Sequence, residues 1–274
     1  MTLFGAIWMF VLFLTANGFT FELSAISIFY AFIYSVISIL CNTSSFFAMT
    51  LGKVSTVTLY MLLGGLILPF FYGIIFLNEI LTVFKVLGIF LMFLSVFLPM
   101  LLDKKTDKEQ QKSKKIAFTV LCILVFILNG LISIVSKAHQ INEQAVGTVD
   151  FLILTAVISF TITFVLILIL TIKNKKQNKF IEAALNGVGK AFTLKWITIM
   201  FCISGAYIIM NGLGNIFSLT CAITMDSSIQ FPVISGAVVT LTALLSWIFF
   251  KESIKKLDAL GIAFAIAGII MFII

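Results

Sequence analysis

Long apolar runs, each ended by a short polar connection, follow one another through nearly the whole chain. A helix needs about 20 apolar residues to cross the ~30 Å hydrocarbon layer of a membrane. Because a backbone in lipid must satisfy its own hydrogen bonds, continuous runs of this length predict helices rather than a barrel. Only 11% of the residues are charged, against roughly 25% in soluble chains. We therefore expect an all-α polytopic membrane protein.

Nine membrane spans can be drawn, which together would form a helical bundle. The two longest connections are rich in lysine, and the second contains a segment, 180–192, with the pattern of an amphipathic helix on the membrane surface. The expected spans are 1–17, 23–47, 54–77, 83–102, 116–136, 149–172, 196–221, 228–250 and 257–274.

The lysines predict how the spans are oriented. All 18 basic residues are lysines, and sixteen of them lie on one side, at 53, in 104–115, in 173–195 and in 251–256. Only Lys85 and Lys137 fall on the other side. Cytoplasmic connections carry an excess of Lys and Arg, so the lysine-rich side is expected to be cytoplasmic. This clustering is typical of membrane anchoring and does not indicate a nucleic-acid partner.

The sequence also matches itself after a shift of 173 positions, the difference between Glu79 and Glu252, without a gap from Phe19 onward. Polar matches carry the argument, because Asn and Glu are rare in segments this apolar. An internal duplication of this kind indicates a transporter fold. The matched positions include Tyr34 with Tyr207, Asn42 with Asn215, Ser45 with Ser218, Ser55 with Ser228, Glu79 with Glu252, and Gly88 with Gly261.

The duplication predicts two repeats of opposite orientation. Equivalent spans are five apart, and this odd number inverts one copy relative to the other across the membrane. The span 116–136 has no upstream partner, so a ten-helix plan would need one more helix before Met1: either the chain begins at an internal Met or this member has lost that helix. We expect a first repeat of four helices at 1–102, a cytoplasmic connection at 103–115 and a second repeat of five helices at 116–274.

The same residues resemble a known group. Leu77-Asn78-Glu79 followed by Leu87-Gly88-Ile89, repeated as Phe250-Lys251-Glu252 and Leu260-Gly261-Ile262, is similar to the EamA-like family of the drug/metabolite transporter superfamily. The resemblance covers 19–101 and 192–274. It implies ten helices in two inverted repeats, a central cavity, and movement or efflux of a small metabolite or drug. This chain departs from the family in lacking the first helix and in placing its carboxy terminus outside.

Uncharged polar residues at mid-membrane depth are the candidate substrate-binding groups. Polar side chains in hydrocarbon usually face the bundle interior or a water-filled cavity. The alternative is that each amide hydrogen-bonds a neighbouring helix. Asn42 and Asn215 occupy matching positions, Asn211 lies one turn before Asn215, and Asn129 interrupts the fifth span. The full candidate set is Asn42, Asn129, Asn211, Asn215, Tyr60, Gln230, Ser45 and Ser218.

Glu79 and Glu252 lie at the mouths of spans, so we assign them a structural role, capping or pairing at the next helix start, rather than proton coupling. Gly88 and Gly261 are expected to let helices approach closely. The one histidine, His139, is placed in a loop, and a lone histidine builds neither a catalytic triad nor a histidine metal site. We expect no enzyme, cofactor or metal.

These observations favour a secondary transporter that moves a small organic molecule by alternating access, in a plasma membrane such as a bacterial cytoplasmic membrane. Its expected partners are the substrate, membrane lipid and, as one option, a second copy in a homodimer. A lipid-carrier flippase or an accessory membrane subunit of the same fold is the alternative, and it would need a laterally open groove. A membrane enzyme would need clustered acids or histidines, which the sequence lacks.

Overall fold

The computed structural model describes residues 20–52, 54–102, 112–173, 194–250 and 256–273, with four isolated positions before residue 20. Within these ranges every regular element is an α-helix. The first expected span, 1–17, lies almost entirely outside the described residues, as do the expected surface helix 180–192 and Glu252.

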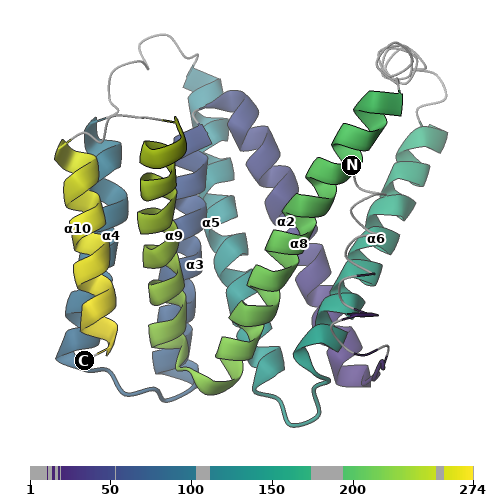
Figure 1. Ribbon diagram of the computed structural model, residues 1–274, viewed down its shortest axis with the longest axis horizontal. Coiled ribbons are helices and arrows are strands. Elements are labelled where there is room, and N and C mark those ends of the chain that lie inside the picture. Colours follow the sequence, from purple (N-terminus) through teal and green to yellow (C-terminus); the bar gives the residue numbers. More distant parts are fainter. Residues whose placement is uncertain are drawn as a thin grey trace. The chain divides into compact units, whose positions relative to one another are not determined.

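Each expected span that falls in the described ranges is a helix (Figure 1). Five of these helices contain segments long and apolar enough to cross a membrane: Ala25–Leu51, Thr56–Phe76, Ile116–Gln140, Thr148–Leu166 and Phe201–Thr224. The chain is thus an all-helical protein consistent with an integral membrane protein. The helices are α2 (Ala25–Leu51), α3 (Val54–Phe76), α4 (Val83–Leu102), α5 (Lys112–Gln140), α6 (Thr148–Lys173), α8 (Leu194–Thr224), α9 (Ser227–Phe250) and α10 (Lys256–Ile273).

The chain divides into two compact units. The first comprises Met1–Val36 with His139–Thr220, and the second comprises Ile37–Ala138 with Cys221–Ile274. The chain passes from one unit to the other inside α2, near the end of α5 and inside α8. Each unit has its own apolar core.

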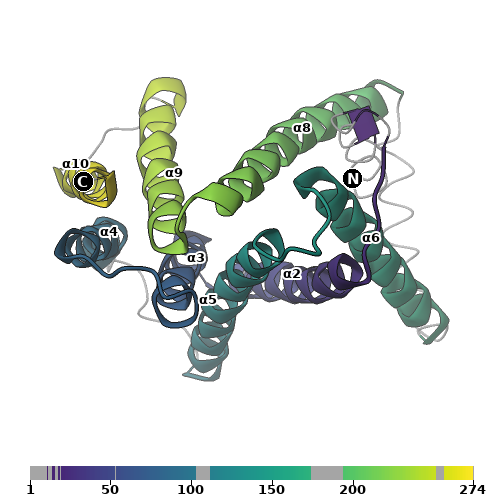
Figure 2. The ribbon, with the colours of Figure 1, turned by 90° about the horizontal axis from the view of Figure 1, so that it is seen from below.

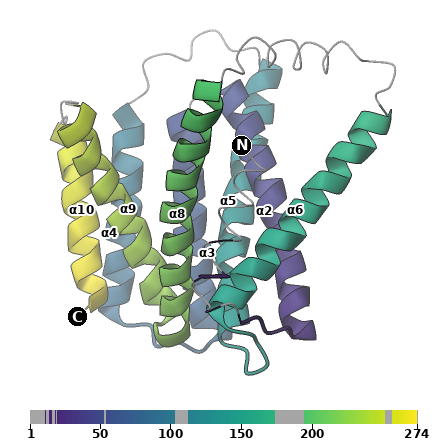
Figure 3. The ribbon, with the colours of Figure 1, turned by 45° about the vertical axis from the view of Figure 1, so that its right-hand side comes forward.

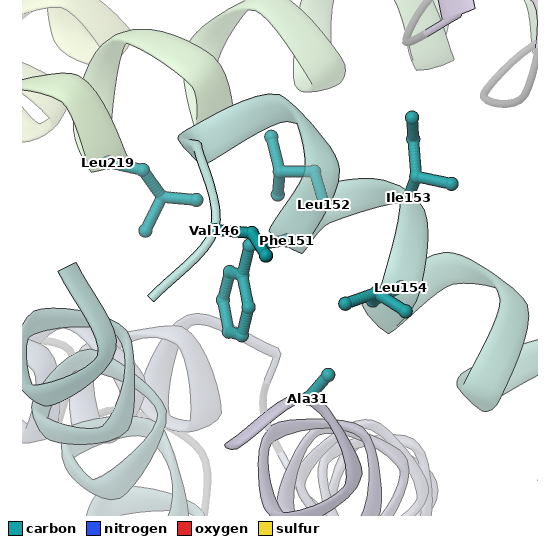
Figure 4. Packing of buried hydrophobic residues seen from close by; sticks show 7 residues of the cluster. All are labelled: Ala31, Val146, Phe151, Leu152, Ile153, Leu154 and Leu219. Atoms are coloured by element: carbon teal, nitrogen blue, oxygen red, sulfur yellow. The ribbon is translucent and has the colours of Figure 1, made fainter. Parts of the chain in front are cut away.

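The first unit packs around the start of α6. Phe151 is fully buried, and the three residues that follow it are buried as well, so this turn of α6 is enclosed on every side. Ala31 of α2 and Leu219 of α8 belong to the same cluster. Figure 4 shows the Phe151 ring with Val146, Leu219 and Ala31 around it.

The second unit contains a bundle of α3, α4, α9 and α10. α4 packs along α10, α3 along α9, and α9 along α10, as Figures 2 and 3 show. Buried small residues make the α4–α10 contact close: a side chain at Gly88 would strike Phe272, and one at Gly268 would strike Met92. Helices that approach this closely gain van der Waals contact, which drives association in a membrane.

The paired helices of this bundle run in opposite directions. Glu79, just beyond the end of α3, accepts hydrogen bonds from the first residues of α9. Gly88, near the start of α4, packs against Phe272, near the end of α10. α3 is therefore antiparallel to α9, and α4 to α10. These are the pairs that the 173-residue shift equates, since Val54 falls on Ser227 and Val83 on Lys256.

A second cluster of this unit joins the later part of α2 to α3 and α5. It includes Cys41, Val57 and Val125, all buried. α3 and α5 touch through their backbones, because a side chain at Gly64 would collide with the carbonyl of Phe126. This close approach places the Asn129 side chain of α5 against the backbone of α3.

Candidate functional site

A polar stripe runs along one face of α8. Tyr207, Asn211, Asn215 and Ser218 follow one another at intervals of four, four and three residues, which places them on the same side of a helix. Tyr207 is 69% exposed, Asn211 is also exposed, and Asn215 and Ser218 are half-buried. The Asn215 Nδ2 donates to Asn211 Oδ1 at 3.0 Å, so the two amides form one polar unit.

α2 carries the matching stripe. Tyr34, Ser38, Asn42 and Ser45 have the same spacing, and each is separated by 173 positions from its counterpart on α8. The Asn42 Nδ2 donates to Ser38 Oγ at 3.5 Å, which repeats the bond of Asn215 to Asn211 one helical turn back. The match of Ser38 with Asn211 was available in the sequence, but the sequence analysis did not use it.

The two stripes retain hydrogen-bonding capacity beyond these local bonds. An Asn side chain offers two donors and a carbonyl oxygen, and one bond uses only part of that capacity. Asn42 and Asn211 are exposed on helices that are otherwise apolar. A polar group facing hydrocarbon is costly, so such positions usually face water, protein or a ligand. Each stripe therefore offers donors and acceptors for neutral hydrogen bonds.

Other predicted site residues lie in packed surroundings. Asn129 does not interrupt α5, which continues to Gln140, and its Nδ2 donates to the carbonyl of Met61 in α3 at 2.7 Å. Tyr60 is half-buried and packs against the cluster of α2, α3 and α5. Gln230 is buried in α9. Ser45 donates to the carbonyl of Cys41 at 2.8 Å.

Four charged side chains that the sequence analysis did not bring together meet at the turn between α8 and α9. Glu79, Lys85 and Lys137 contact this turn or the helix ends beside it, and Asp226 lies in the turn itself. We call these four residues the turn clamp. The sequence analysis assigned only two lysines, Lys85 and Lys137, to the predicted non-cytoplasmic side of the membrane. Both of these lysines belong to the turn clamp.

Glu79 is held in place by the end of α3. Asn78 adopts a left-handed conformation with φ 54°, which Asn tolerates better than most residues. The Glu79 N–H bonds back to the carbonyl of Gly73 at 3.1 Å, and the carboxylate packs where a side chain at Gly73 would be. This carboxylate accepts the N–H groups of Ser227 and Ser228 at 2.6 and 2.8 Å. Glu79 thus caps α9, whereas we had expected it to act at the start of the next helix along the chain.

Lys85 and Lys137 are both buried in helices, Lys85 in α4 and Lys137 in α5. The Lys85 Nζ donates to Asp226 Oδ2 at 3.2 Å and to Ser228 Oγ at 2.9 Å. The Lys137 Nζ donates to the carbonyls of Ala222 and Met225, both at 2.6 Å, at the C-terminal end of α8. A cation at this end of a helix complements the partial negative charge of the free carbonyls.

His139 also differs from its predicted position, since it lies in the last turn of α5 and is fully buried. Its ring stacks on Phe151 with centroids 3.8 Å apart. Gln140 Nε2 bonds its Nδ1 at 3.0 Å, so Nε2 carries the proton and donates to Ser27 Oγ at 2.9 Å. The Val146 N–H donates to the same hydroxyl at 3.0 Å. These bonds account for His139 as a neutral core residue.

The remaining predicted positions are two glycines. Gly88 and Gly261 are buried in α4 and α10. Within the described ranges no group of three or more His, Cys, Asp or Glu side chains could hold a metal ion. The four cysteines are free thiols.

Comparison of the sequence with models of protein families and with curated proteins gave no match.

Proposed function

We propose that the protein is a secondary transporter of the EamA-like type, in the drug/metabolite transporter superfamily. In this proposal the spans form two inverted repeats on a ten-helix plan. The two repeats would alternate in opening a central site to each side of the membrane. The transported solute is a small organic molecule, and the membrane is the plasma membrane, with the lysine-rich connections in the cytoplasm.

The observation that carries the proposal is the antiparallel pairing in the second unit. The sequence match equates α3 with α9 and α4 with α10, and the contacts of Glu79 and Gly88 require opposite directions in both pairs. Copies that ran in the same direction would not produce these contacts. Inverted-topology repeats of this kind are typical of secondary transporters.

The polar stripes indicate how the solute would be bound. In both stripes an Asn donates a hydrogen bond to the polar residue one turn earlier, and no charged residue stands in either stripe. We therefore assign solute binding to neutral hydrogen bonds, chiefly from Asn211 and Asn215 on α8 and from Asn42 on α2. A solute that hydrogen-bonds these amides would use the donors and acceptors that the bonds within each stripe leave over.

Solute flux into proteoliposomes tests this function. The purified chain is reconstituted and assayed with amino acids, nucleosides and cationic dyes, and then with Asn211→Leu and Asn215→Leu. Each substitution is expected to reduce flux at least about tenfold, the effect of losing one or two well-formed hydrogen bonds to a solute. Asn129→Leu is the matched control. Its amide already bonds Met61, so flux per folded molecule should remain within about twofold of wild type.

Two results would contradict the proposal. One is flux that is unchanged in both α8 variants at normal expression, which would remove the stripe from the binding site. The other is the absence of flux for every solute in the panel while the reconstituted protein moves lipid between leaflets, which would favour the flippase alternative.

A further inference from the structure

The turn clamp holds the α8–α9 connection with charges that match the helix ends. Lys137 is bonded to the free carbonyls at the end of α8, and Glu79 is bonded to the free N–H groups at the start of α9. Helix ends carry partial charges of opposite sign, so each side chain complements the end it contacts. Lys85 connects the turn to the start of α9, because its Nζ donates to both Asp226 in the turn and Ser228 in α9.

Packing alone does not explain why charges occupy this place. The clamp contains two cations and two anions, and the Lys85 side chain is only 9% exposed. Burying an ion pair often gives no more stability than well-packed apolar side chains of similar volume. The chain uses apolar packing almost everywhere else, with 61% hydrophobic residues. Ser227 Oγ, beside the clamp, is buried without a hydrogen-bond partner among the described residues, and water would satisfy it if the turn opened.

The sequence match compares the Lys85–Asp226 pair of the clamp with a second pair of charged residues. A shift of 173 places Lys53 at the position of Asp226 and Asp258 at the position of Lys85, so this pair keeps opposite charges but exchanges them, while Glu79 matches Glu252. A site for an ion of fixed sign would not tolerate this exchange. An ion pair that only holds two helix ends together would tolerate the exchange, because two opposite charges attract each other equally when they are exchanged.

We infer that the turn clamp is a latch, closed in this structure, that opens and closes during transport. This inference rests on the proposed function. α8 carries the polar stripe and ends in the clamped turn, with Ser218 one turn before Ala222. The clamp holds the C-terminal end of α8, and opening of the latch would release that end. Lys85, Lys137 and Glu79 are thus positioning residues, and the solute contacts the stripe.

Thiol labelling at Ser227 measures the latch directly. Ser227→Cys is introduced into a full-length chain whose four native cysteines are replaced by alanine, and modification by N-ethylmaleimide is followed with and without a transported solute. Ser227 is fully buried, so labelling of the Ser227→Cys thiol should be slow. Lys85→Met removes two charge-assisted hydrogen bonds and should accelerate labelling about fivefold. Lys85→Asp combined with Asp226→Lys should restore slow labelling.

Thr82→Ala is the control for general loosening of the same loop. Its hydroxyl accepts the Lys85 backbone N–H at 3.2 Å at the start of α4 and takes no part in the clamp. It should leave labelling within about twofold of the parent chain. In the parent chain, a transported solute should accelerate labelling, because transport requires the latch to open.

The outcomes separate the latch from the transport function. If the Ser227→Cys thiol is labelled at the same rate with Lys85 and with Lys85→Met, the clamp does not close the turn and the inference is overturned. Accelerated labelling in Lys85→Met with no effect of a solute that is transported shows a permanent fastening and overturns the latch. Absence of flux for every solute overturns the proposed function, while the comparison of Lys85 with Lys85→Met still decides whether the clamp closes the turn.

Discussion

Replacing Glu79 with Gln should destabilise the protein strongly for a change of so few atoms. The carboxylate accepts two N–H groups of α9 at 2.6 and 2.8 Å from a half-buried position. Glutamine has one oxygen, so one of these bonds becomes neutral and the second N–H faces an NH₂ group. Hydrogen bonds to charged groups contribute about 1.5–3 kcal/mol each, and the charge at the helix start adds about 0.3–1 kcal/mol.

Taking the lower part of these ranges for a half-buried group, we expect Glu79→Gln to cost about 2–3 kcal/mol. For a chain of this size that loss should lower the unfolding midpoint by about 4–8 °C. The assay is thermal unfolding in detergent, followed by tryptophan fluorescence. Glu143→Gln makes the same chemical change at an exposed position between α5 and α6 and should shift the midpoint by less than about 2 °C. Equal midpoints for the two variants would refute the cap.

Three further predictions use the same assay. Gly64→Ala should destabilise by about 1–3 kcal/mol, because the added methyl meets a backbone carbonyl of α5, whereas Gly214→Ala, with open space around it, should be neutral or stabilising. Asp226→Asn should cost about 2–3 kcal/mol by leaving a buried ammonium without its carboxylate. Lys85→Met should cost less, about 1 kcal/mol, because the remaining carboxylate is 50% exposed and water can solvate it; the reverse order would contradict the clamp. Asn129→Leu should cost about 0.6–1.7 kcal/mol by losing its bond to α3, and an unchanged midpoint would contradict that bond.

Most helices could be predicted from the sequence because polar residues separate the apolar runs sharply. The expected spans 54–77 and 83–102 correspond to α3 (Val54–Phe76) and α4 (Val83–Leu102). The prediction was wrong where a helix continues through charged residues. The predicted span 116–136 stops just before Lys137, but α5 continues to Gln140. The helix can include this lysine because its Nζ donates hydrogen bonds to two carbonyls at the end of α8.

The candidate site was less accessible to sequence reasoning, because its contacts join distant parts of the chain. Glu79 and Ser227 are 148 positions apart, and Lys85 and Asp226 are 141 apart. Nothing near Glu79 in sequence shows that its carboxylate caps α9. The stripe of α8 could be found, since helical spacing places Asn211 and Asn215 on one face. Whether an amide bonds a neighbouring helix, as Asn129 does, depends on packing that periodicity does not show.

The side from which each helix end can be reached tests inversion most directly. Thr50 and Ile223 are exposed, lie near the ends of α2 and α8, and are separated by the repeat shift of 173. Single cysteines at these positions, and at Asn78 as a reference in the α3–α4 turn, are labelled in oriented membranes with an impermeant thiol reagent. The account predicts that Ile223→Cys and Asn78→Cys react from one side and Thr50→Cys from the other. Labelling of Thr50→Cys and Ile223→Cys from the same side would contradict inverted repeats, and with them the transport proposal.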